Sequence, residues 1–224
     1  MNILEIIKGK LIVSCQALEH EPLHGSSIMR KMAKAAKEGG AVAIRANGKA
    51  DIIEIKEETN LPVIGLVKKD YSDCAVYITP TMTEINELIE SGCEIIAMDA
   101  TNRCQPDRVS LKEKVDLIHG ANLLAMADIS TFDEAIFAES IGFDLVSTTL
   151  SGYTPYSRQD EGPDVLLVGQ LVKALKIPVI AEGRIATVEH LRAIKEQNPF
   201  AIVVGSAITR PQMITKRFFD AYNE

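Results

Sequence analysis

Eight short apolar segments recur along the chain, separated by longer and more polar stretches. They cover residues 11–15, 41–44, 62–67, 94–98, 122–126, 143–147, 178–181 and 200–204. Most are almost continuously hydrophobic and rich in branched side chains, which is typical of strands covered on both faces in a parallel sheet. Parallel neighbours need long crossover connections, and the intervening stretches are long enough to supply them. This alternation predicts an α/β fold.

The stretches between these segments carry the signals of helices. Apolar side chains repeat with helical period in residues 26–40, 83–92, 111–120, 131–142, 165–176 and 187–198. Hydroxyl side chains, which favour helix N-caps, stand where five helices should begin: Ser26, Thr83, Ser110, Thr131 and Thr187. Eight strands alternating with helices predict a closed (β/α)8 TIM barrel, and a doubly wound open sheet is the alternative.

Residues 1–224 are expected to form one barrel domain. A chain of 224 residues lies within the size range of a single barrel, and no linker rich in Pro, Gly or Ser divides it. Residues 2–9 are expected to form a short helix that closes the bottom of the barrel.

Composition and charge argue against several classes of protein. The net charge of −7 is not that of a nucleic-acid-binding surface. Glu5 and Lys8 interrupt the first apolar residues, and no apolar stretch is long enough to span a bilayer, so no secretion signal and no membrane anchor are expected. The four cysteines form no C-x-x-C pair, which favours free thiols in the cytoplasm over disulfides: Cys15, Cys74, Cys93 and Cys104.

Polar side chains stand where the expected strands end. In a (β/α)8 barrel these ends meet at one rim, where catalytic residues lie. Any one of these side chains is also explained by barrel packing, but their convergence predicts a functional site, with Asp99 left open between a functional and a structural role. The residues are Gln16, Arg45, Lys68, Lys69, Asp99, Asp128, Thr149, Glu182 and Ser206.

The last two strand ends carry the clearest chemical signal. The seventh expected strand runs into EGRI and the eighth into GSAITRP. Glycines let backbone N–H groups approach an anion, and a phosphate bound between these two strands is a recurrent feature of such barrels. We therefore expect a phosphate site, with the alternative that the glycines only turn the chain. The expected phosphate ligands are Gly183, Arg184, Gly205, Ser206 and Arg210.

Lys68 follows the apolar segment PVIGLV at the third strand end. Burial and a neighbouring cation such as Arg45 both disfavour the ammonium form, so we expect the pKa of Lys68 to fall toward neutrality. A neutral lysine amine can abstract a proton next to a carbonyl. Glu182, Asp128 and Asp99 are candidates for handling hydroxyl protons or holding the lysine. The alternative for Lys68 is a counter-ion to phosphate or carboxylate.

One apparent metal motif is set aside. The segment HEPLH, residues 20–24, matches the metalloprotease pattern H-E-x-x-H. That chemistry needs both histidines on one helix, and Pro22 would disrupt a helix here. No metal site is therefore expected.

Eight sequence segments spread over the whole chain resemble those of one enzyme family. They are SCQALEHEPLHG, AVAIRANG, PVIGLVKKDY, AMDAT, LLAMADIST, DLVSTTLSGYT, PVIAEGRI and VVGSAITRP. By these segments the chain is identified as a member of the N-acetylmannosamine-6-phosphate 2-epimerase family, with a ribulose-phosphate-binding-type barrel. The resemblance implies that Lys68 is the acid/base lysine and Glu182 its partner carboxylate. It also implies that Gln16, Arg45 and Asp128 hold the sugar and organise the lysine, beside a phosphate cup formed by EGRI, VGSA and the arginine of ITRP.

The resemblance implies an activity in the breakdown of sialic acid. N-acetylmannosamine 6-phosphate, a phosphorylated amino sugar, is converted to N-acetylglucosamine 6-phosphate by inversion at C2, with no metal or redox cofactor. As a hypothesis, Lys68 removes the C2 proton of the open-chain sugar, which the C1 aldehyde acidifies. Either a second acid such as Glu182 or Lys68 itself returns a proton on the opposite face. Barrels of this size commonly dimerise through their outer helices, so a homodimer is a candidate assembly.

The residues alone leave other functions open. A Schiff-base aldolase or another sugar-phosphate isomerase uses the same barrel and the same lysine. A flavin enzyme uses the same phosphate cup, although a chain with 5% aromatic residues offers little to hold an isoalloxazine. A non-catalytic sugar-phosphate sensor leaves the ionisable residues at the strand ends unexplained.

Overall fold

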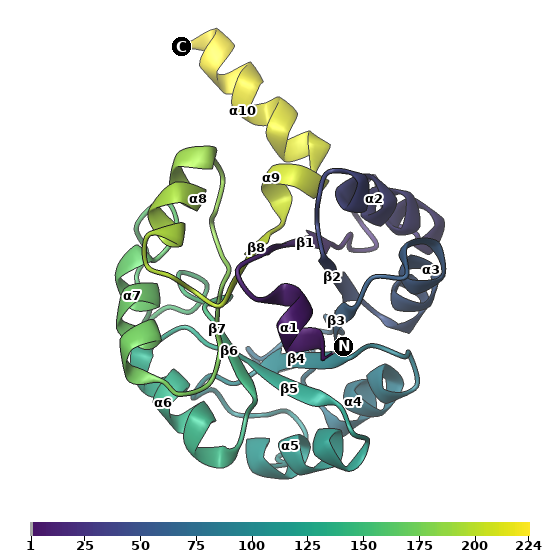
Figure 1. Ribbon diagram of the computed structural model, residues 1–224, viewed down its shortest axis with the longest axis vertical. Helices are drawn as coiled ribbons and strands as arrows, with labels where there is room; N and C mark the ends of the chain where they lie inside the picture. Colours follow the sequence, from purple (N-terminus) through teal and green to yellow (C-terminus); the bar gives the residue numbers. More distant parts are fainter. Residues whose placement is uncertain (1) are drawn as a thin grey trace.

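Residues 2–224 are described by a computed structural model, in which eight parallel strands close into a barrel surrounded by helices (Figure 1). The strands follow one another around the barrel in chain order, and the last pairs with the first. The prediction of a (β/α)8 TIM barrel is confirmed, and the open-sheet alternative is excluded. The strands are β1 (Leu11–Cys15), β2 (Ala43–Asn47), β3 (Val63–Leu66), β4 (Ile95–Asp99), β5 (Leu124–Asp128), β6 (Leu145–Ser147), β7 (Val179–Ala181) and β8 (Ala201–Val204).

All eight strands coincide with the predicted apolar segments, although their ends differ by up to three residues. The largest difference is at β2, which continues through the polar residues Arg45 and Asn47. The predicted segment ended at Ile44 because the apolar run ends there. Backbone pairing with β1 and β3 extends the strand to Asn47. Arg45 therefore lies within a strand, with its side chain inside the barrel.

The six predicted helices are all present, but two of the five predicted N-caps are wrong. Ser110, Thr131 and Thr187 are N-caps as predicted. Ser26 is instead the first helical residue, after Gly25, and Thr81 caps the next helix in place of Thr83. The helices are α2 (Ser26–Glu38), α4 (Met82–Ile89), α5 (Leu111–Gly120), α6 (Phe132–Ile141), α7 (Val165–Ala174) and α8 (Val188–Lys195).

The two wrong caps have physical reasons. The Ser26 hydroxyl is directed to another segment, because it donates to Asp51 at 2.7 Å, and Gly25 occupies the N-cap position before it. Thr81 accepts from the backbone N–H of Thr83 at 3.2 Å, and the Glu84 carboxylate accepts from the N–H of Thr81 at 3.0 Å. This reciprocal arrangement is a capping box, and it favours Thr81 over the threonine two residues later.

Three further helices were not among those predicted: α3 (Lys49–Thr59), α9 (Ser206–Thr209) and α10 (Pro211–Asn223). In α3 the sequence DIIEIKEE nearly alternates branched and charged residues, which resembles a strand. Only packing identifies it as a helix, because Ile52 and Ile55 are buried against the barrel. Helix α10 projects away from the barrel and buries none of its residues (Figure 1).

A short N-terminal helix, α1 (Ile3–Ile7), closes one end of the barrel, as predicted for residues 2–9 (Figure 1). Ile3 and Ile7 join inward-facing strand residues such as Ile12, Ile64 and Met126 in one apolar cluster. A second cluster lies between the strands and the surrounding helices. Since apolar side chains fill the barrel at the end closed by α1, polar side chains inside it gather at the opposite rim.

No helix among residues 2–224 is long and apolar enough to cross a membrane. In the same residues all four cysteines have free thiols, with Cys15 and Cys93 buried and Cys104 exposed.

The packing of α3 and α4 against β3 requires a glycine at position 65. A Cβ atom there would meet Cδ1 of Ile52 at 2.9 Å, Sγ of Cys93 at 3.0 Å and Cδ2 of Leu88 at 3.1 Å. We expect Gly65→Ala to lower the free energy of unfolding by about 1–3 kcal/mol, because overpacking forces these side chains apart. Urea denaturation followed by circular dichroism measures the change.

Gly120→Ala is the matched control for this prediction. Gly120 ends α5, and a Cβ atom there meets no atom within 4 Å. We expect its stability to stay unchanged or to rise by up to about 1 kcal/mol. If Gly65→Ala is as stable as Gly120→Ala, the side chains around β3 can move to accept the added methyl group without loss of stability, and the prediction is wrong.

Candidate active site

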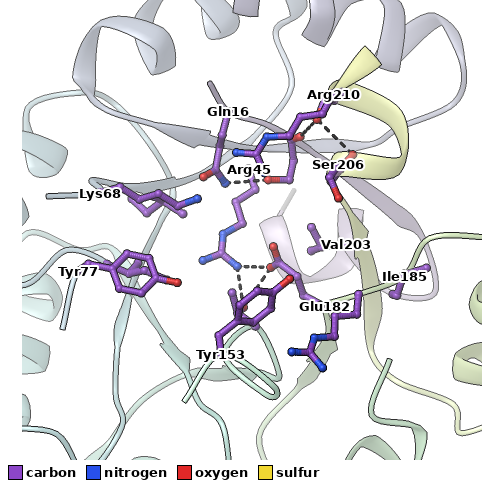
Figure 2. A pocket seen from close by; sticks show the side chains of 18 residues that line it. Gln16, Arg45, Lys68, Tyr77, Tyr153, Glu182, Ile185, Val203, Ser206 and Arg210 are labelled. Atoms are coloured by element: carbon purple, nitrogen blue, oxygen red, sulfur yellow. Dashed lines mark hydrogen bonds and ion pairs between the residues drawn. The ribbon is translucent and has the colours of Figure 1, made fainter. Parts of the chain in front are cut away.

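The predicted rim residues meet around one cavity at the carboxyl ends of the strands (Figure 2). They come from the ends of β1, β2, β3, β7 and β8 or from the loops after them, so the barrel assembles them from positions up to 194 residues apart, from Gln16 to Arg210. Three predicted rim residues are not in the wall of the cavity: Lys69, Asp99 and Asp128. The predicted residues in the wall are Gln16, Arg45, Lys68, Glu182, Gly183, Arg184, Gly205, Ser206 and Arg210.

The Arg45 guanidinium lies at the centre of this rim. Its side chain is 1% exposed, and it forms ion pairs with Asp128 at the end of β5 and with Glu182 after β7. Nη1 also donates to Oγ1 of Thr149 at 2.8 Å. Burial acts to lower the pKa of Arg45, but the two carboxylates outweigh it and raise the pKa, so the guanidinium stays charged.

Asp128 lies behind Arg45, fully buried. Besides its ion pair with Arg45, it accepts a hydrogen bond from Oγ1 of Thr149 at 2.7 Å. Burial raises the pKa of Asp128 above its usual range, against the attraction of Arg45 and together with the repulsion of Glu182. Asp128 thus orients Arg45 and Thr149 from below the cavity.

Lys68 reaches the cavity from the loop after β3, on the side opposite Glu182 (Figure 2). The Asn47 side chain accepts from the backbone N–H of Lys68 at 2.7 Å and fixes the start of this loop. Burial is the main cause that lowers the pKa of Lys68 to about 8, and the nearby cations Arg45 and Arg210 lower it further. Lys69, in contrast, points outward and pairs with Glu84 at 3.1 Å. Among residues 2–224, Nζ of Lys68 has no such partner.

Gln16 presents an unused acceptor to the cavity. Its Nε2 donates to Oγ of Ser14 at 2.7 Å. Its Oε1 is buried and has no hydrogen-bond partner among residues 2–224. Since a buried polar atom without a partner costs free energy, this oxygen is suited to a ligand hydroxyl or amide N–H.

The two expected phosphate-binding turns lie side by side where β7 and β8 end. Gly183 has a φ of 109°, which favours glycine, and a Cβ at Gly205 would lie 3.3 Å from Cβ of Ser14 on β1. Among residues 2–224 the backbone N–H groups of Gly183 and Arg184 have no acceptor. Gly183, Arg184 and Ser206 all line the cavity, where free donors of this kind favour an anion.

The side chain of Arg184 is engaged by the loop between β6 and α7. Its Nη1 donates to the carbonyl of Asp160 at 2.7 Å, and its Nη2 donates to the carbonyl of Gly152. The guanidinium also stacks over the Tyr153 ring, 5.2 Å from the centroid. Arg184 therefore fastens this loop beside the cavity, while its backbone belongs to the turn that is expected to bind phosphate.

Arg210 lies between α9 and α10, and its guanidinium pairs with Glu21 from the loop after β1. Nε of Arg210 is 2.6 Å from Oε1 of Glu21, and Nη2 donates to Oε2 at 2.9 Å. Glu21 belongs to the segment HEPLH, which contributes this ion pair to the site. No group of three or more His, Cys, Asp or Glu side chains that could hold a metal occurs in residues 2–224.

Sequence reasoning missed Tyr77 and Tyr153, whose hydroxyl groups point into the cavity (Figure 2). The loop after β3 turns back on itself, with the N–H of Lys69 donating to the carbonyl of Tyr77 at 2.9 Å. This brings Tyr77 beside Lys68, and no periodic signal in the sequence marks it. Burial raises the pKa of Tyr77 to about 12, so its phenol is a neutral donor or acceptor at physiological pH.

Asp99 binds its own loop rather than the cavity. Its Oδ1 accepts from the hydroxyl of Thr101 at 2.6 Å, and its Oδ2 pairs with Nη2 of Arg103 at 2.5 Å. Arg103 in turn donates to the carbonyl of Ala75 at 2.7 Å, in the loop that carries Tyr77. These contacts favour the structural interpretation of Asp99.

Comparison with known proteins matches the whole barrel. The model of a family described as "Putative N-acetylmannosamine-6-phosphate epimerase" matches residues 29–224. Relatives from Clostridium perfringens (strain SM101 / Type A) and Clostridioides difficile (strain 630) are 59% and 58% identical, and each is named "Putative N-acetylmannosamine-6-phosphate 2-epimerase". Both matches cover 97% of this chain and 98% of the relative.

Solved structures agree with these relatives. The N-acetylmannosamine-6-phosphate 2-epimerase from Clostridium perfringens superposes with a TM-score of 0.97 at 57% identity, covering 99% of this chain and 96% of that chain. Thiamine phosphate pyrophosphorylase from Pyrococcus furiosus superposes with a TM-score of 0.63 at 18% identity, covering 96% and 92%, which shows a shared fold alone. The chain therefore belongs to the N-acetylmannosamine-6-phosphate epimerase family.

Proposed function

We propose that this protein interconverts N-acetylmannosamine 6-phosphate and N-acetylglucosamine 6-phosphate by removing and returning the proton on C2. The observation that carries the proposal is Lys68, whose pKa is lowered to about 8 and whose Nζ has no ion-pair partner among residues 2–224, in a cavity also lined by the turns after β7 and β8. An amine with this pKa is a competent base at neutral pH, and the family's named substrate has an acidic C–H when its ring is open.

In this proposal Lys68 is the catalytic base. The C1 aldehyde of the open-chain sugar acidifies C2, and the neutral Lys68 amine takes that proton. The electrons of the broken C–H bond move into an enediol-like system, with negative charge on O1. The Arg45 guanidinium, which reaches the same cavity, is placed to stabilise this charge. Either the Lys68 ammonium, after the intermediate rotates, or a second acid then returns a proton to the opposite face of C2, and the electrons on O1 re-form the aldehyde.

Glu182 has a separate catalytic role in this scheme. It lines the cavity opposite Lys68 and forms an ion pair with Arg45 (Figure 2). In ring opening its carboxylate takes the proton of the C1 hydroxyl as the C1–O bond of the ring breaks, and passes that proton to the ring oxygen, which becomes a hydroxyl. We assign ring opening to Glu182 and the C2 proton to Lys68, with Asp128 acting through Arg45.

The phosphate group is assigned to the opposite end of the cavity. Backbone N–H groups of Gly183 and Arg184, the turn at Gly205 and the Ser206 hydroxyl provide neutral donors there, and Arg210 adds a cation. Binding the 6-phosphate at this end orients the sugar with C1 and C2 toward Lys68. The unpaired Oε1 of Gln16 then accepts from the sugar or its acetamido N–H.

We also propose that two copies of the chain associate through α10. This helix buries none of its residues, and its apolar side chains are largely exposed, with Phe218 at 76% and Tyr222 at 89%. Apolar side chains grouped on one projecting helix mark an interaction site more often than a monomer surface. A second copy of the chain has the same helix, so in a dimer each α10 buries its apolar side chains against the other copy.

Lys68→Met tests the assigned base. We expect C2 hydrogen exchange and epimerisation of N-acetylmannosamine 6-phosphate to fall by about 10²–10⁴-fold, because the variant keeps the shape and loses the base. Proton NMR in deuterated water reports both reactions together. The matched control is Lys69→Met at the exposed neighbouring lysine, which should keep rates near those of the unmodified protein. Full exchange in Lys68→Met would remove Lys68 from the mechanism, and a borohydride-trapped adduct on Lys68 would favour the aldolase.

The pH dependence follows from the lowered pKa of Lys68, which is about 8. Only the neutral amine is a base, so activity is lost as the pH falls through this value. We expect kcat/KM to rise about tenfold per pH unit from pH 6.5 to near 8 and then to level off. A flat profile below pH 8, or a rise that continues to pH 10, would contradict the lowered pKa.

The assembly is tested by replacing Phe218 and Phe219 with serine together. We expect light scattering to give twice the chain mass for the unmodified protein and the single chain mass for the variant. Phe137→Ser on α6 removes an aromatic side chain of 47% exposure from another helix and should leave the dimer intact. A single chain mass for the unmodified protein would end the dimer proposal.

A further inference from the structure

The ion pair between Glu21 and Arg210 is not explained by the chemistry proposed above. Glu21 lies in the loop after β1, and Arg210 precedes α10, so the two are separated by 189 residues in the chain. Their side chains are 12% and 25% exposed, respectively. A solvent-exposed ion pair contributes little to stability. This ion pair, in contrast, is largely buried at the edge of the cavity.

The Glu21 carboxylate is held in place from several sides. Oε1 lies 2.6 Å from Nε of Arg210 and accepts from Nε2 of Gln212 at 3.3 Å. Oε2 accepts from Nη2 of Arg210 at 2.9 Å and from the backbone N–H of Leu18 at 2.9 Å. The contact with Leu18 closes a turn, because the N–H of Glu21 donates back to the Leu18 carbonyl at 2.8 Å. The carboxylate therefore has a fixed position and a fixed orientation.

The geometry of the guanidinium decides what this contact leaves free. An arginine has five N–H donors arranged around a planar fork. Glu21 engages the edge formed by Nε and Nη2: Nη2 donates to Oε2 at 2.9 Å, and Nε lies 2.6 Å from Oε1 in an ion pair without hydrogen-bond geometry. The opposite edge, formed by Nη1 and the second Nη2 hydrogen, is unused by Glu21. Arg210 lines the same cavity as Gly205 and Ser206.

The charge state of Glu21 supports this arrangement. Burial acts to raise the pKa of Glu21, but hydrogen bonds from Arg210 and the Leu18 backbone outweigh it and hold the pKa below its usual range. Glu21 is therefore a carboxylate at neutral pH, and its negative charge offsets one positive charge beside Lys68. When no ligand is bound, the Glu21 carboxylate therefore compensates the positive charge of Arg210 at this end of the cavity.

We propose that Glu21 is a positioning residue that holds Arg210 by one edge of its guanidinium and presents the other edge to the substrate phosphate. The inference rests on the proposed function, because it assigns the 6-phosphate to this end of the cavity. Glu21 itself touches no substrate atom. Its contribution is preorganisation: an arginine that is already oriented loses less side-chain entropy when the phosphate binds.

The experiment measures phosphate affinity separately from turnover. Inorganic phosphate is titrated by calorimetry into the unmodified protein and into Glu21→Gln, Glu21→Asp, Arg210→Gln and the double variant Glu21→Gln/Arg210→Gln. The same proteins are assayed for kcat and KM with N-acetylmannosamine 6-phosphate. Glu19→Gln is the matched control, because Glu19 is exposed in the same loop and its removal changes the net charge equally.

We expect Glu21→Gln to weaken inorganic phosphate binding and to raise KM by about tenfold, with kcat changed by less than about twofold. Glu21→Asp keeps the charge on a shorter side chain, so its phosphate affinity and KM should lie between those of the unmodified protein and those of Glu21→Gln. In the Arg210→Gln background, Glu21→Gln should have no further effect, because the partner through which it acts is gone. Glu19→Gln should match the unmodified protein.

Two results would overturn the inference. Tighter phosphate binding by Glu21→Gln would mean that Glu21 competes with phosphate for Arg210. An equal loss of affinity in the Arg210→Gln background would mean that Glu21 acts on the fold of its loop. If the unmodified protein fails to epimerise the sugar, the proposed function fails while the calorimetric test of Glu21 still stands. Circular dichroism checks that each variant is folded. If Glu21→Gln is unfolded, the phosphate affinity of Glu21→Asp is used in its place.

Discussion

The buried positive charge of Arg45 is the constraint on which the rest of the site depends. Removing a guanidinium from water costs several kcal/mol, and only closely paired negative charges offset that cost. Asp128 and Glu182 provide them, from β5 and the end of β7, while Arg45 comes from β2. Since no two of these three strands are neighbours in the barrel, the three side chains meet across its interior when the barrel is closed. The ion pairs thus link the chemistry of the rim to completion of the fold.

The same cation connects the two ends of the cavity. In the proposed mechanism Lys68 needs a low pKa to act as a base, yet the phosphate dianion of the substrate attracts a proton to any nearby amine. Arg45 and Arg210 both lower the pKa of Lys68 and so oppose this attraction, while Glu182 and Glu21 raise it. The two cations therefore allow one cavity to bind an anion and keep its base neutral.

The barrel and most of the rim could be predicted from the sequence because they depend on regular patterns. Apolar runs mark strands, and chain order in a parallel barrel brings Gln16, Lys68 and Glu182 to one edge without knowledge of any loop. The contact of Glu21 with Arg210 could not be predicted, because it depends on the path of an irregular turn that contains Pro22. Tyr77 was missed for the same reason: its loop folds back beside Lys68 through backbone hydrogen bonds that no residue type specifies.

Arg184 shows why a residue at a strand end is hard to interpret from its type alone. Its position after Gly183 predicted a phosphate contact, whereas its guanidinium spans the loop between β6 and α7 and occupies the space where a Gly152 side chain would lie. The backbone of Arg184 adopts a φ of 54° and faces the cavity. The stacked Tyr153 lines the same cavity. Since one residue shapes the phosphate-binding turn and fastens the neighbouring loop, a change at Arg184 alters both at once, and loss of phosphate affinity on its replacement is not by itself evidence of a direct ionic contact.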